Sequence, residues 1–267
     1  MIRVIIAGAT GWVGKALVAA VQEAPDLALV AAVARSAAGR DAGEMAGIGP
    51  IGVEVLPDIE AALAIPADVV VDYTKPGAVK GHALKTIAAG RHVVIGTSGL
   101  GAEDYAEIDD AAKEAGVGVI AAGNFSITAT LLKRFALEAA KYVPDVEIID
   151  YAAAQKPDVP SGTARELAET LSFERQHPTS RPVDDLTGIR ETRGGAIGLS
   201  TPVQVHSVRM PGYRLSCEVL FGLADERLAL RHDAGSSAAP YVGGTLLAVR
   251  KVAEKPGLRR GLDSIMD

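Results

Sequence analysis

The 267-residue sequence has a single cysteine, no long apolar run and no excess of positive charge. Cys217 has no partner for an internal disulfide, and the apolar, strand-like run around it predicts a buried structural thiol. No run approaches the roughly 18 apolar residues that are needed to cross a membrane. The formal net charge of −6 argues against a nucleic-acid partner. These absences predict a soluble, acidic globular protein.

Metal-binding and targeting signals are also missing. The five histidines form no close ligand pair and there is no second cysteine, so no metal site is predicted. The first residues form a strand-like apolar run instead of a basic, cleavable leader, which makes the cytoplasm the expected location. The length suits two modest domains.

A glycine turn, GATGWVG at residues 8–14, follows the apolar run at residues 2–7 and precedes a helical pattern at residues 13–23. Gly8 would permit the tight turn, Gly11 would let backbone N–H groups approach a pyrophosphate, and Gly14 would let the helix pack closely on the strand. Because a strand precedes the turn and a helix follows it, the pattern predicts a dinucleotide-binding turn. A plain strand-to-helix turn is the alternative.

The second predicted strand, residues 27–33, ends in Ala34, Arg35 and Ser36. No acidic residue stands there to bind the ribose 2′-hydroxyl of NAD. A guanidinium and a hydroxyl can instead hold the 2′-phosphate of NADP through charge-assisted hydrogen bonds. The pattern therefore favours NADPH, with NADH bound more weakly, unless Arg35 is only a solvated surface arginine.

Strand and helix patterns alternate as far as residue 126, with strands expected at residues 68–72, 92–95 and 118–121 and helices at residues 79–89 and 103–115. This alternation predicts a doubly wound parallel sheet of the Rossmann type. Ligands bind at the carboxyl ends of such strands. The loops at residues 73–76, 96–99 and 123–126 are therefore expected to form a nicotinamide pocket, although small and polar residues are also common in ordinary loops.

The order of predicted strands and helices changes beyond residue 126. Helices are expected at residues 128–142 and 163–171 and strands at residues 146–151, 203–209, 213–221 and 227–232. This order predicts a second α+β domain with a mixed open sheet. Residues 174–194 are expected to form a long surface loop, and residues 238–254 a final helix.

The second half also contains QKPDVPSGTA at residues 155–164. Ser161, Gly162 and Thr163 lead into a predicted helix, whose first N–H groups can bind a carboxylate. Lys156 would add a positive charge. The alternative is that Ser161 or Thr163 is only the helix N-cap.

Together these motifs resemble the dihydrodipicolinate reductase (4-hydroxy-tetrahydrodipicolinate reductase) family over nearly the whole chain. The resemblance rests on GATGWVG, on DAGEMAG at residues 41–47, DYTKP at 72–76, VIGTSGL at 94–100, GNFSI at 123–127 and, most specifically, KPDVPSGTA at 156–164. It implies a cytoplasmic, tetrameric NAD(P)H-dependent reductase of the diaminopimelate and lysine pathway, whose C-terminal helix returns to the nucleotide domain. The expected domains are a dinucleotide-binding domain (residues 1–126 and 235–267) and a substrate-binding and oligomerisation domain (residues 127–234).

The resemblance also implies which residues bind the ligands. Cofactor contacts are expected from the glycine turn, the end of the second strand and the three loops, namely Gly8, Thr10, Gly11, Trp12, Val13, Gly14, Arg35, Ser36, Tyr73, Thr74, Gly96, Thr97, Ser98, Gly123, Asn124 and Phe125. Substrate contacts are expected from Lys156, Ser161, Gly162 and Thr163, and Lys156 is also the expected catalytic residue.

Some positions depart from the family pattern. Ala152, Ala153 and Gln155 stand where the family has histidines, the first of which is usually assigned as the proton donor, and Trp12 and Thr10 replace an arginine and a glycine. The first functional hypothesis is therefore a reductase of a small cyclic imine or unsaturated (di)carboxylate. Its proton would come from Lys156, Tyr151, water or the substrate, and His206 is the residue to examine next. The alternative is a catalytically impaired NADPH-binding homologue that serves as a sensor or an assembly partner.

Overall fold

The computed structural model describes residues 1–175, 179, 185, 187–188 and 195–266. The chain divides into two compact units, each considered by itself below. Unit 1 comprises Met1–Ile127 with Ser237–Asp267, and unit 2 comprises Thr128–Ser236. Within the described residues, none of the helices combines the length and the apolar character that a membrane span requires.

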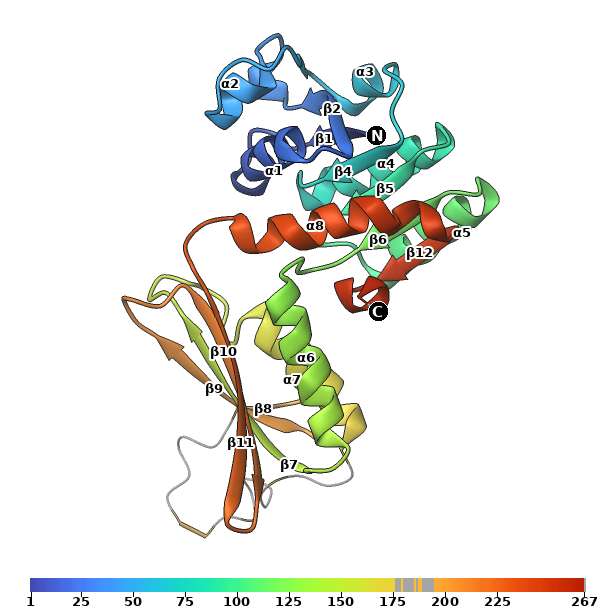
Figure 1. Ribbon diagram of the computed structural model, residues 1–267. Coiled ribbons are helices and arrows are strands. Elements are labelled where there is room, and N and C mark those ends of the chain that lie inside the picture. The colour runs from blue at the N-terminus through green and yellow to red at the C-terminus, as the bar shows by residue number, and fades with distance from the viewer. Residues whose placement is uncertain (176–178, 180–184, 186, 189–194, 267) are drawn as a thin grey trace. The chain divides into compact units, whose positions relative to one another are not determined.

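Unit 1 contains a seven-stranded parallel sheet in the order β12-β6-β5-β4-β1-β2-β3 (Figure 1). Its strands are β1 (Ile2–Ala7), β2 (Leu27–Val33), β3 (Val55–Leu56), β4 (Val69–Asp72), β5 (His92–Ile95), β6 (Gly118–Ala121) and β12 (Gly257–Arg260). The order β3-β2-β1-β4-β5-β6 is that of doubly wound dinucleotide-binding folds, in which strand order reverses between β1 and β4. The predicted Rossmann-type sheet is therefore confirmed.

Helices cover both faces of this sheet, which is why its strands are almost continuously apolar. Val4 and Ile6 of β1 pack with helices α1 (Trp12–Glu23) and α8 (Ala239–Lys251), whereas Ile5 packs with α3 (Ile59–Leu63). Alternate residues of β5 and β6 pack with α4 (Pro76–Ala88) and α5 (Ala102–Glu114). The remaining short helices of unit 1 are η1 (Arg35–Ala37), α2 (Ala42–Ala46), η3 (Val252–Glu254) and η4 (Leu262–Ile265).

Several features of unit 1 differ from the sequence-based expectations, since β3, α2 and α3 were not predicted. Helix α4 begins at Pro76 rather than at residue 79, because proline is favoured at the first helical position, where its missing N–H needs no partner. Strand β12 was not predicted. Its four residues are too few and too polar to show a period, yet they pair with β6, and the Asp109 carboxylate accepts from the Leu258 amide at 2.8 Å.

Unit 2 contains a five-stranded mixed sheet in the order β11-β10-β7-β9-β8. Its strands are β7 (Asp145–Ala152), β8 (Ala196–Ile197), β9 (Val203–Arg209), β10 (Leu215–Leu223) and β11 (Glu226–Ala234). Strands β7 and β9 run parallel, and the other neighbours are antiparallel. Helices α6 (Ile127–Ala140) and α7 (Gly162–Glu174) supply the apolar partners of one sheet face.

Alternation along β7 assigns its side chains to two faces. Val146 and Ile148 belong to the buried core with α6 and α7, so Asp150 and Ala152 point to the same face. Tyr151 points to the other face, where no described helix of unit 2 contributes to a core. The predicted mixed open sheet is therefore confirmed.

Cys217 of β10 points to the helix-covered face and is 2% exposed, so the prediction of a buried thiol is confirmed. Burial raises the pKa of this thiol to about 12, with smaller contributions from the charges of Asp150 and Glu218. The predicted surface loop at residues 174–194 lies largely outside the described residues, and α7 continues to Glu174 beyond the expected end at residue 171.

Candidate functional site

The glycine turn lies where the strand order of unit 1 reverses. Gly8 has a positive φ of 84°, and a Cβ at this position would lie 2.4 Å from the Tyr73 carbonyl oxygen. A Cβ on Gly14 would lie 2.1 Å from the Gly8 carbonyl oxygen. Only glycine fits at these two positions. The turn is therefore packed directly between helix α1 and the end of β4.

Helix α1 begins without a side-chain cap on its N-terminus. Its first N–H groups, which include those of Trp12 and Val13, therefore have no side-chain partner and can bind an anion. Trp12 is 58% exposed and stands edge-to-face on Tyr241 of α8, with 5.7 Å between the ring centroids. Thr10 is half-buried beside them. An indole therefore borders the proposed pyrophosphate site.

The end of β2 presents two arginines. Arg35 and Ser36 are exposed in helix η1, as is Arg40 a few residues further on. Asp41 fixes the segment that follows, because its carboxylate accepts from four amides, those of residues 43, 44, 51 and 52. Sequence analysis did not single out Arg40, although a basic residue so close to the end of β2 was a readable signal.

The loops after β4 and β5 use several of the predicted cofactor residues for their own structure. The Thr74 and Thr97 hydroxyls both donate to the Asp72 carboxylate, at 2.6 and 2.9 Å. The Tyr73 hydroxyl lies 2.8 Å from the Thr245 hydroxyl of α8, and burial raises the pKa of Tyr73. These hydroxyls are therefore engaged within unit 1.

The remaining predicted cofactor residues divide into buried and open positions. Phe125 is 1% exposed in the core, and the Asn124 side chain accepts from the Ser126 amide at 2.8 Å. Ser98 and Gly123 are exposed at the carboxyl ends of their strands. The open groups of these loops are thus mainly backbone atoms and the Ser98 hydroxyl.

In unit 2, Ser161 is tied to a buried carboxylate at the end of β7. Asp150 is fully buried and accepts from the Ser161 amide at 2.8 Å and the Ser161 hydroxyl at 2.7 Å. The same hydroxyl accepts from the Ala164 amide at 3.3 Å, which makes Ser161 the N-cap of α7. Ser161 is therefore the N-cap of α7, and its hydroxyl is already hydrogen-bonded to Asp150.

Arg209 supplies the positive charge that Asp150 requires. Its Nη2 donates to the Asp150 carboxylate and to the Asp158 carbonyl, both at 2.7 Å. The side chain is only 13% exposed. Sequence analysis assigned Arg209 no role, since 59 residues separate it from Asp150. The Arg209 side chain connects the end of β9 with the end of β7 and with the loop that carries Lys156.

The groups that remain open beside the Ser161 turn suit a carboxylate. Gly162 is exposed and Thr163 half-buried in the first turn of α7, where N–H groups are free of intrahelical partners. Lys156 has a 30% exposed side chain and forms an ion pair with Asp158 at 2.8 Å. This ion pair holds the pKa of Asp158 below its usual value. The ammonium thus lies in the loop that leads to the turn.

Two residues considered as proton donors lie on the wrong face of the sheet. Tyr151 points away from Asp150, donates to Glu218 at 3.0 Å, and has its pKa raised by burial and by that bond. His206 pairs with Ile149 in register, so it also points to the open face, where it contacts Glu147 at 2.8 Å. Neither can serve the Ser161 turn.

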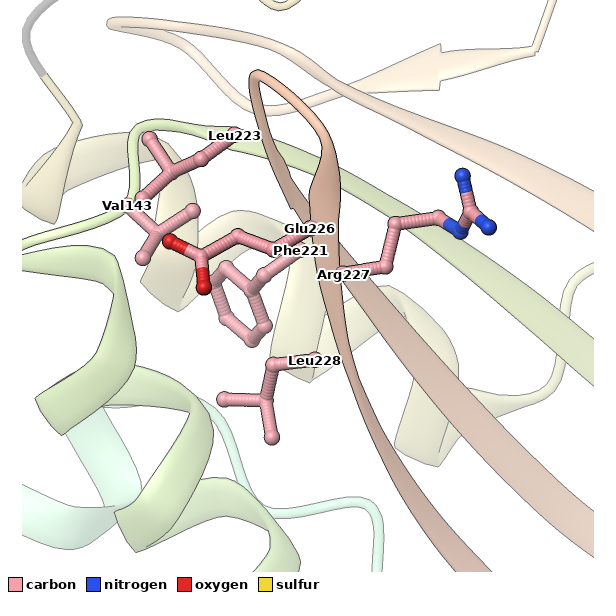
Figure 2. Close-up of a pocket in the computed structure, with 6 residues that line it drawn as sticks. All are labelled: Val143, Phe221, Leu223, Glu226, Arg227 and Leu228. Carbon is pink, nitrogen blue, oxygen red and sulfur yellow. The ribbon is translucent and has the colours of Figure 1, made fainter.

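A pocket lies at the opposite end of the unit 2 sheet, near the turn between β10 and β11 (Figure 2). Its lining is mostly apolar and consists of Val143, Phe221, Leu223, Glu226, Arg227 and Leu228. It lacks the converging polar groups that an active site needs. The candidate sites are therefore the Ser161 turn in unit 2 and, considered separately, the carboxyl ends of the strands in unit 1.

The fold and the glycine turn define a class, the pyridine-nucleotide-dependent oxidoreductases built on a Rossmann sheet with a second, mixed-sheet domain. Residues 2–125 match the family model "Dihydrodipicolinate reductase, N-terminus" and residues 128–266 match "Dihydrodipicolinate reductase, C-terminus". The chain belongs to the dihydrodipicolinate reductase family, whose members are NAD(P)H-dependent oxidoreductases. This membership favours an enzyme over a non-catalytic binding protein.

Individual relatives agree along the full length. The chain is 39% identical to a 4-hydroxy-tetrahydrodipicolinate reductase of Desulfitobacterium hafniense (100% of this chain, 99% of the relative). It is 40% identical to one of Synechococcus elongatus (99% and 98%). The structure matches that of a dipicolinate-bound dihydrodipicolinate reductase from Paenisporosarcina sp. TG-14 with a TM-score of 0.86, 32% identity and full coverage of both chains.

We expect Arg209→Met to destabilise unit 2 by about 3–5 kcal/mol, because it leaves the buried Asp150 carboxylate without its cation. Urea unfolding measures the loss. The matched control is Arg3→Met, which breaks an exposed ion pair with Asp68 and should change stability little. A loss for Arg209→Met no larger than that of the control would show that Asp150 does not depend on this pair.

Proposed function

We propose that the protein is an NADPH-preferring reductase that delivers hydride to a small cyclic imine or unsaturated dicarboxylate of the dihydrodipicolinate type. The observation that carries the proposal is the Ser161 turn, which Asp150 and Arg209 hold at the start of α7, with Lys156 in the loop that precedes it. A relative with 32% identity was solved with dipicolinate bound, which supports a flat dicarboxylate as the ligand.

In this proposal unit 1 binds the cofactor. The glycine turn suits a pyrophosphate, because α1 begins without a side-chain cap, while Gly8 lets the turn pack closely against Tyr73. Trp12, Thr10, Val13 and Gly14 would line the same turn. The loops of Gly96, Thr97 and Ser98 and of Gly123, Asn124 and Phe125, in which Ser98 and Gly123 are exposed, would receive the nicotinamide end beside Tyr73 and Thr74. The bound cofactor supplies the hydride, and the protein supplies position and charge.

Unit 2 binds the substrate in this proposal. Since the Ser161 hydroxyl is bonded to Asp150, a carboxylate would take the N–H groups of Gly162 and Thr163, the Thr163 hydroxyl and the Lys156 ammonium. Helix dipole and point charge both favour an anion there. This assigns Ser161 to holding the turn and Thr163 to contacting the ligand.

Lys156 is the proposed proton donor after hydride transfer. Its loop leads directly into the turn, whereas Tyr151 and His206 point to the opposite face of the sheet. Asp158 stabilises the charged ammonium through the 2.8 Å ion pair. When the substrate carboxylate arrives, it would compete with Asp158 for the same ammonium.

The proposal includes a homo-oligomer, a tetramer by resemblance to the family. The open face of the unit 2 sheet supports it, because half-buried Ile149, Val208 and Leu220 lie there among ion pairs such as His206–Glu147. A sheet face with half-buried apolar side chains that no described helix of its unit covers is typical of an isologous contact between copies.

Preference for NADPH is expected to depend on Arg35. Arg35→Ala should remove most of the difference between NADPH and NADH, because one charge-assisted contact contributes roughly 1.5–3 kcal/mol, or about ten- to a hundredfold in affinity. Quenching of Trp12, the single tryptophan, reports binding of both cofactors. Arg3→Ala, at the amino end of β1, is the control. Equal affinities in the parent protein would contradict NADPH preference.

Turnover of dihydrodipicolinate-type substrate is expected to be slow, about 10²–10⁴-fold below that of members with the histidine acid, because Ala152 and Ala153 replace it. Loss of NADPH absorbance measures the rate. Lys156→Arg should keep most of the substrate affinity but lower kcat further, since a guanidinium holds its proton. Ordinary family-level turnover, or an unchanged kcat in Lys156→Arg, would show that another group donates the proton.

Pyridine-2,6-dicarboxylate is expected to bind in the presence of NADPH, and Lys156→Ala and Thr163→Val should each weaken it by about tenfold or more. Ser161→Ala should instead mainly lower stability, because its hydroxyl faces Asp150. Lys141→Ala, which breaks an exposed ion pair with Glu138 at the other end of unit 2, is the control. If calorimetry detected no binding by the parent protein, the KPDVPSGTA segment would serve only as a helix cap.

A further inference from the structure

Asp72, at the end of β4, is a buried charge to which the proposed reaction gives no role. The side chain is 1% exposed. Its Oδ1 accepts from the Thr74 amide at 2.9 Å, the Thr74 hydroxyl at 2.6 Å and the Thr97 hydroxyl at 2.9 Å. Its Oδ2 lies 2.8 Å from Nδ1 of His82 in α4, which donates because an ionised carboxylate can only accept. Four hydrogen bonds therefore converge on one carboxylate.

The loops bound to Asp72 also contact each other and the glycine turn. The Gly96 amide donates to the Asp72 carbonyl at 2.9 Å, and a Cβ on Gly96 would lie 2.1 Å from Cζ of the Tyr73 ring. The Tyr73 carbonyl in turn lies against Gly8. With no space between the three loops, a displacement of one is transmitted to the others.

Burial opposes the charge on Asp72, but the bonds from His82, Thr74 and Thr97 outweigh it and hold the pKa of Asp72 below its usual value. The carboxylate is therefore ionised at neutral pH. A buried carboxylate that loses one charge-assisted partner must find another or shift the groups around it. His82 is a half-buried partner, with 22% of its side chain exposed.

We infer that Asp72 and His82 are positioning residues for the cofactor: the His82–Asp72 pair fixes the loops after β4 and β5 against the glycine turn in the arrangement that NADPH binds. The inference rests on the proposed use of these loops for the cofactor. Neither side chain needs to touch the ligand. Asp72 ends β4 and His82 lies in α4, so the pair connects this helix to the loops proposed for the nicotinamide end.

His92 offers a matched comparison within the same sheet. It is also half-buried, and its Nδ1 accepts from the Gly118 amide at 2.9 Å. It stands at the first residue of β5, however, and so at the amino edge of the parallel sheet. Loss of His92 removes one side-chain hydrogen bond from the same unit without touching the loops at the carboxyl edge.

The test measures NADPH affinity by Trp12 quenching, and pyridine-2,6-dicarboxylate affinity by calorimetry, in His82→Leu, His82→Asn, Thr97→Val and His92→Leu. Asparagine places an amide N–H where the Nδ1 of histidine was, so it keeps the bond and loses only the ionisable ring. We expect His82→Leu to weaken NADPH by about tenfold, Thr97→Val to weaken it several-fold, and His82→Asn to stay within about threefold of the parent. His92→Leu should lower the melting temperature but leave NADPH affinity unchanged.

Each outcome supports or contradicts the positioning role of Asp72 and His82. Parent-like NADPH affinity in folded His82→Leu and Thr97→Val would overturn the positioning role while leaving the proposed function intact. If His92→Leu weakened NADPH binding as much as His82→Leu, the effect would be general destabilisation, and the positioning role would be overturned. It would also be overturned if His82→Asn failed to restore NADPH affinity, because the imidazole itself would then be required. If the parent protein did not bind NADPH, the proposed function would fail first and this inference with it.

Discussion

Two buried carboxylates have to be fully hydrogen-bonded in this fold, and the loops that carry the proposed chemistry are shaped by that requirement. Asp72 and Asp150 are 1% and 0% exposed near the ends of β4 and β7. Each accepts an amide and a hydroxyl from a following loop, and each has a nitrogen-containing side chain, His82 or Arg209, as its further partner. An unpaired buried charge is costly by several kcal/mol, so these loops have little freedom.

The same bonds decide which groups remain for ligands. The hydroxyls of Thr74, Thr97 and Ser161 point to the two carboxylates and not outward. What stays open is largely backbone N–H at the starts of α1 and α7, supplemented by the charges of Arg35 and Lys156. Backbone donors on rigid helix starts suit phosphate and carboxylate groups, which are the anionic parts of the proposed cofactor and substrate.

In unit 2, the departures from the family pattern fall on residues expected for proton transfer, whereas in unit 1 they are Thr10 and Trp12 of the glycine turn. Ala152 is fully buried and pairs with Arg209 at the end of β9. As an alanine, it offers no imidazole for proton transfer. Hydride transfer needs only a positioned nicotinamide and a bound acceptor, whereas protonation needs an acid in reach. In this proposal Lys156 takes part in both steps: it helps the first turn of α7 to hold the substrate carboxylate, and it donates the proton.

Much of the fold followed from local sequence patterns, because a glycine turn and strand or helix periodicity act between near neighbours. The Rossmann-type sheet, the mixed open sheet and the buried Cys217 were predicted in this way and confirmed. Strand β12 was missed, because four residues with two arginines show no period and depend on pairing with β6. The start of α4 was misplaced by three residues.

The sequence by itself determined the family and the class of fold, and it supplied the segments of the proposed site. Only the tertiary structure decided how individual side chains are used. Alternation along β7 places Asp150 and Tyr151 on opposite sides of the sheet. Which of these two residues points toward the Ser161 turn depends on the side on which α6 and α7 pack. Likewise, Arg209 meets Asp150 across 59 residues, and Tyr73 meets Thr245 across 172. Such partners are set by strand order and helix packing, which bring distant residues together and leave no mark on the local sequence pattern.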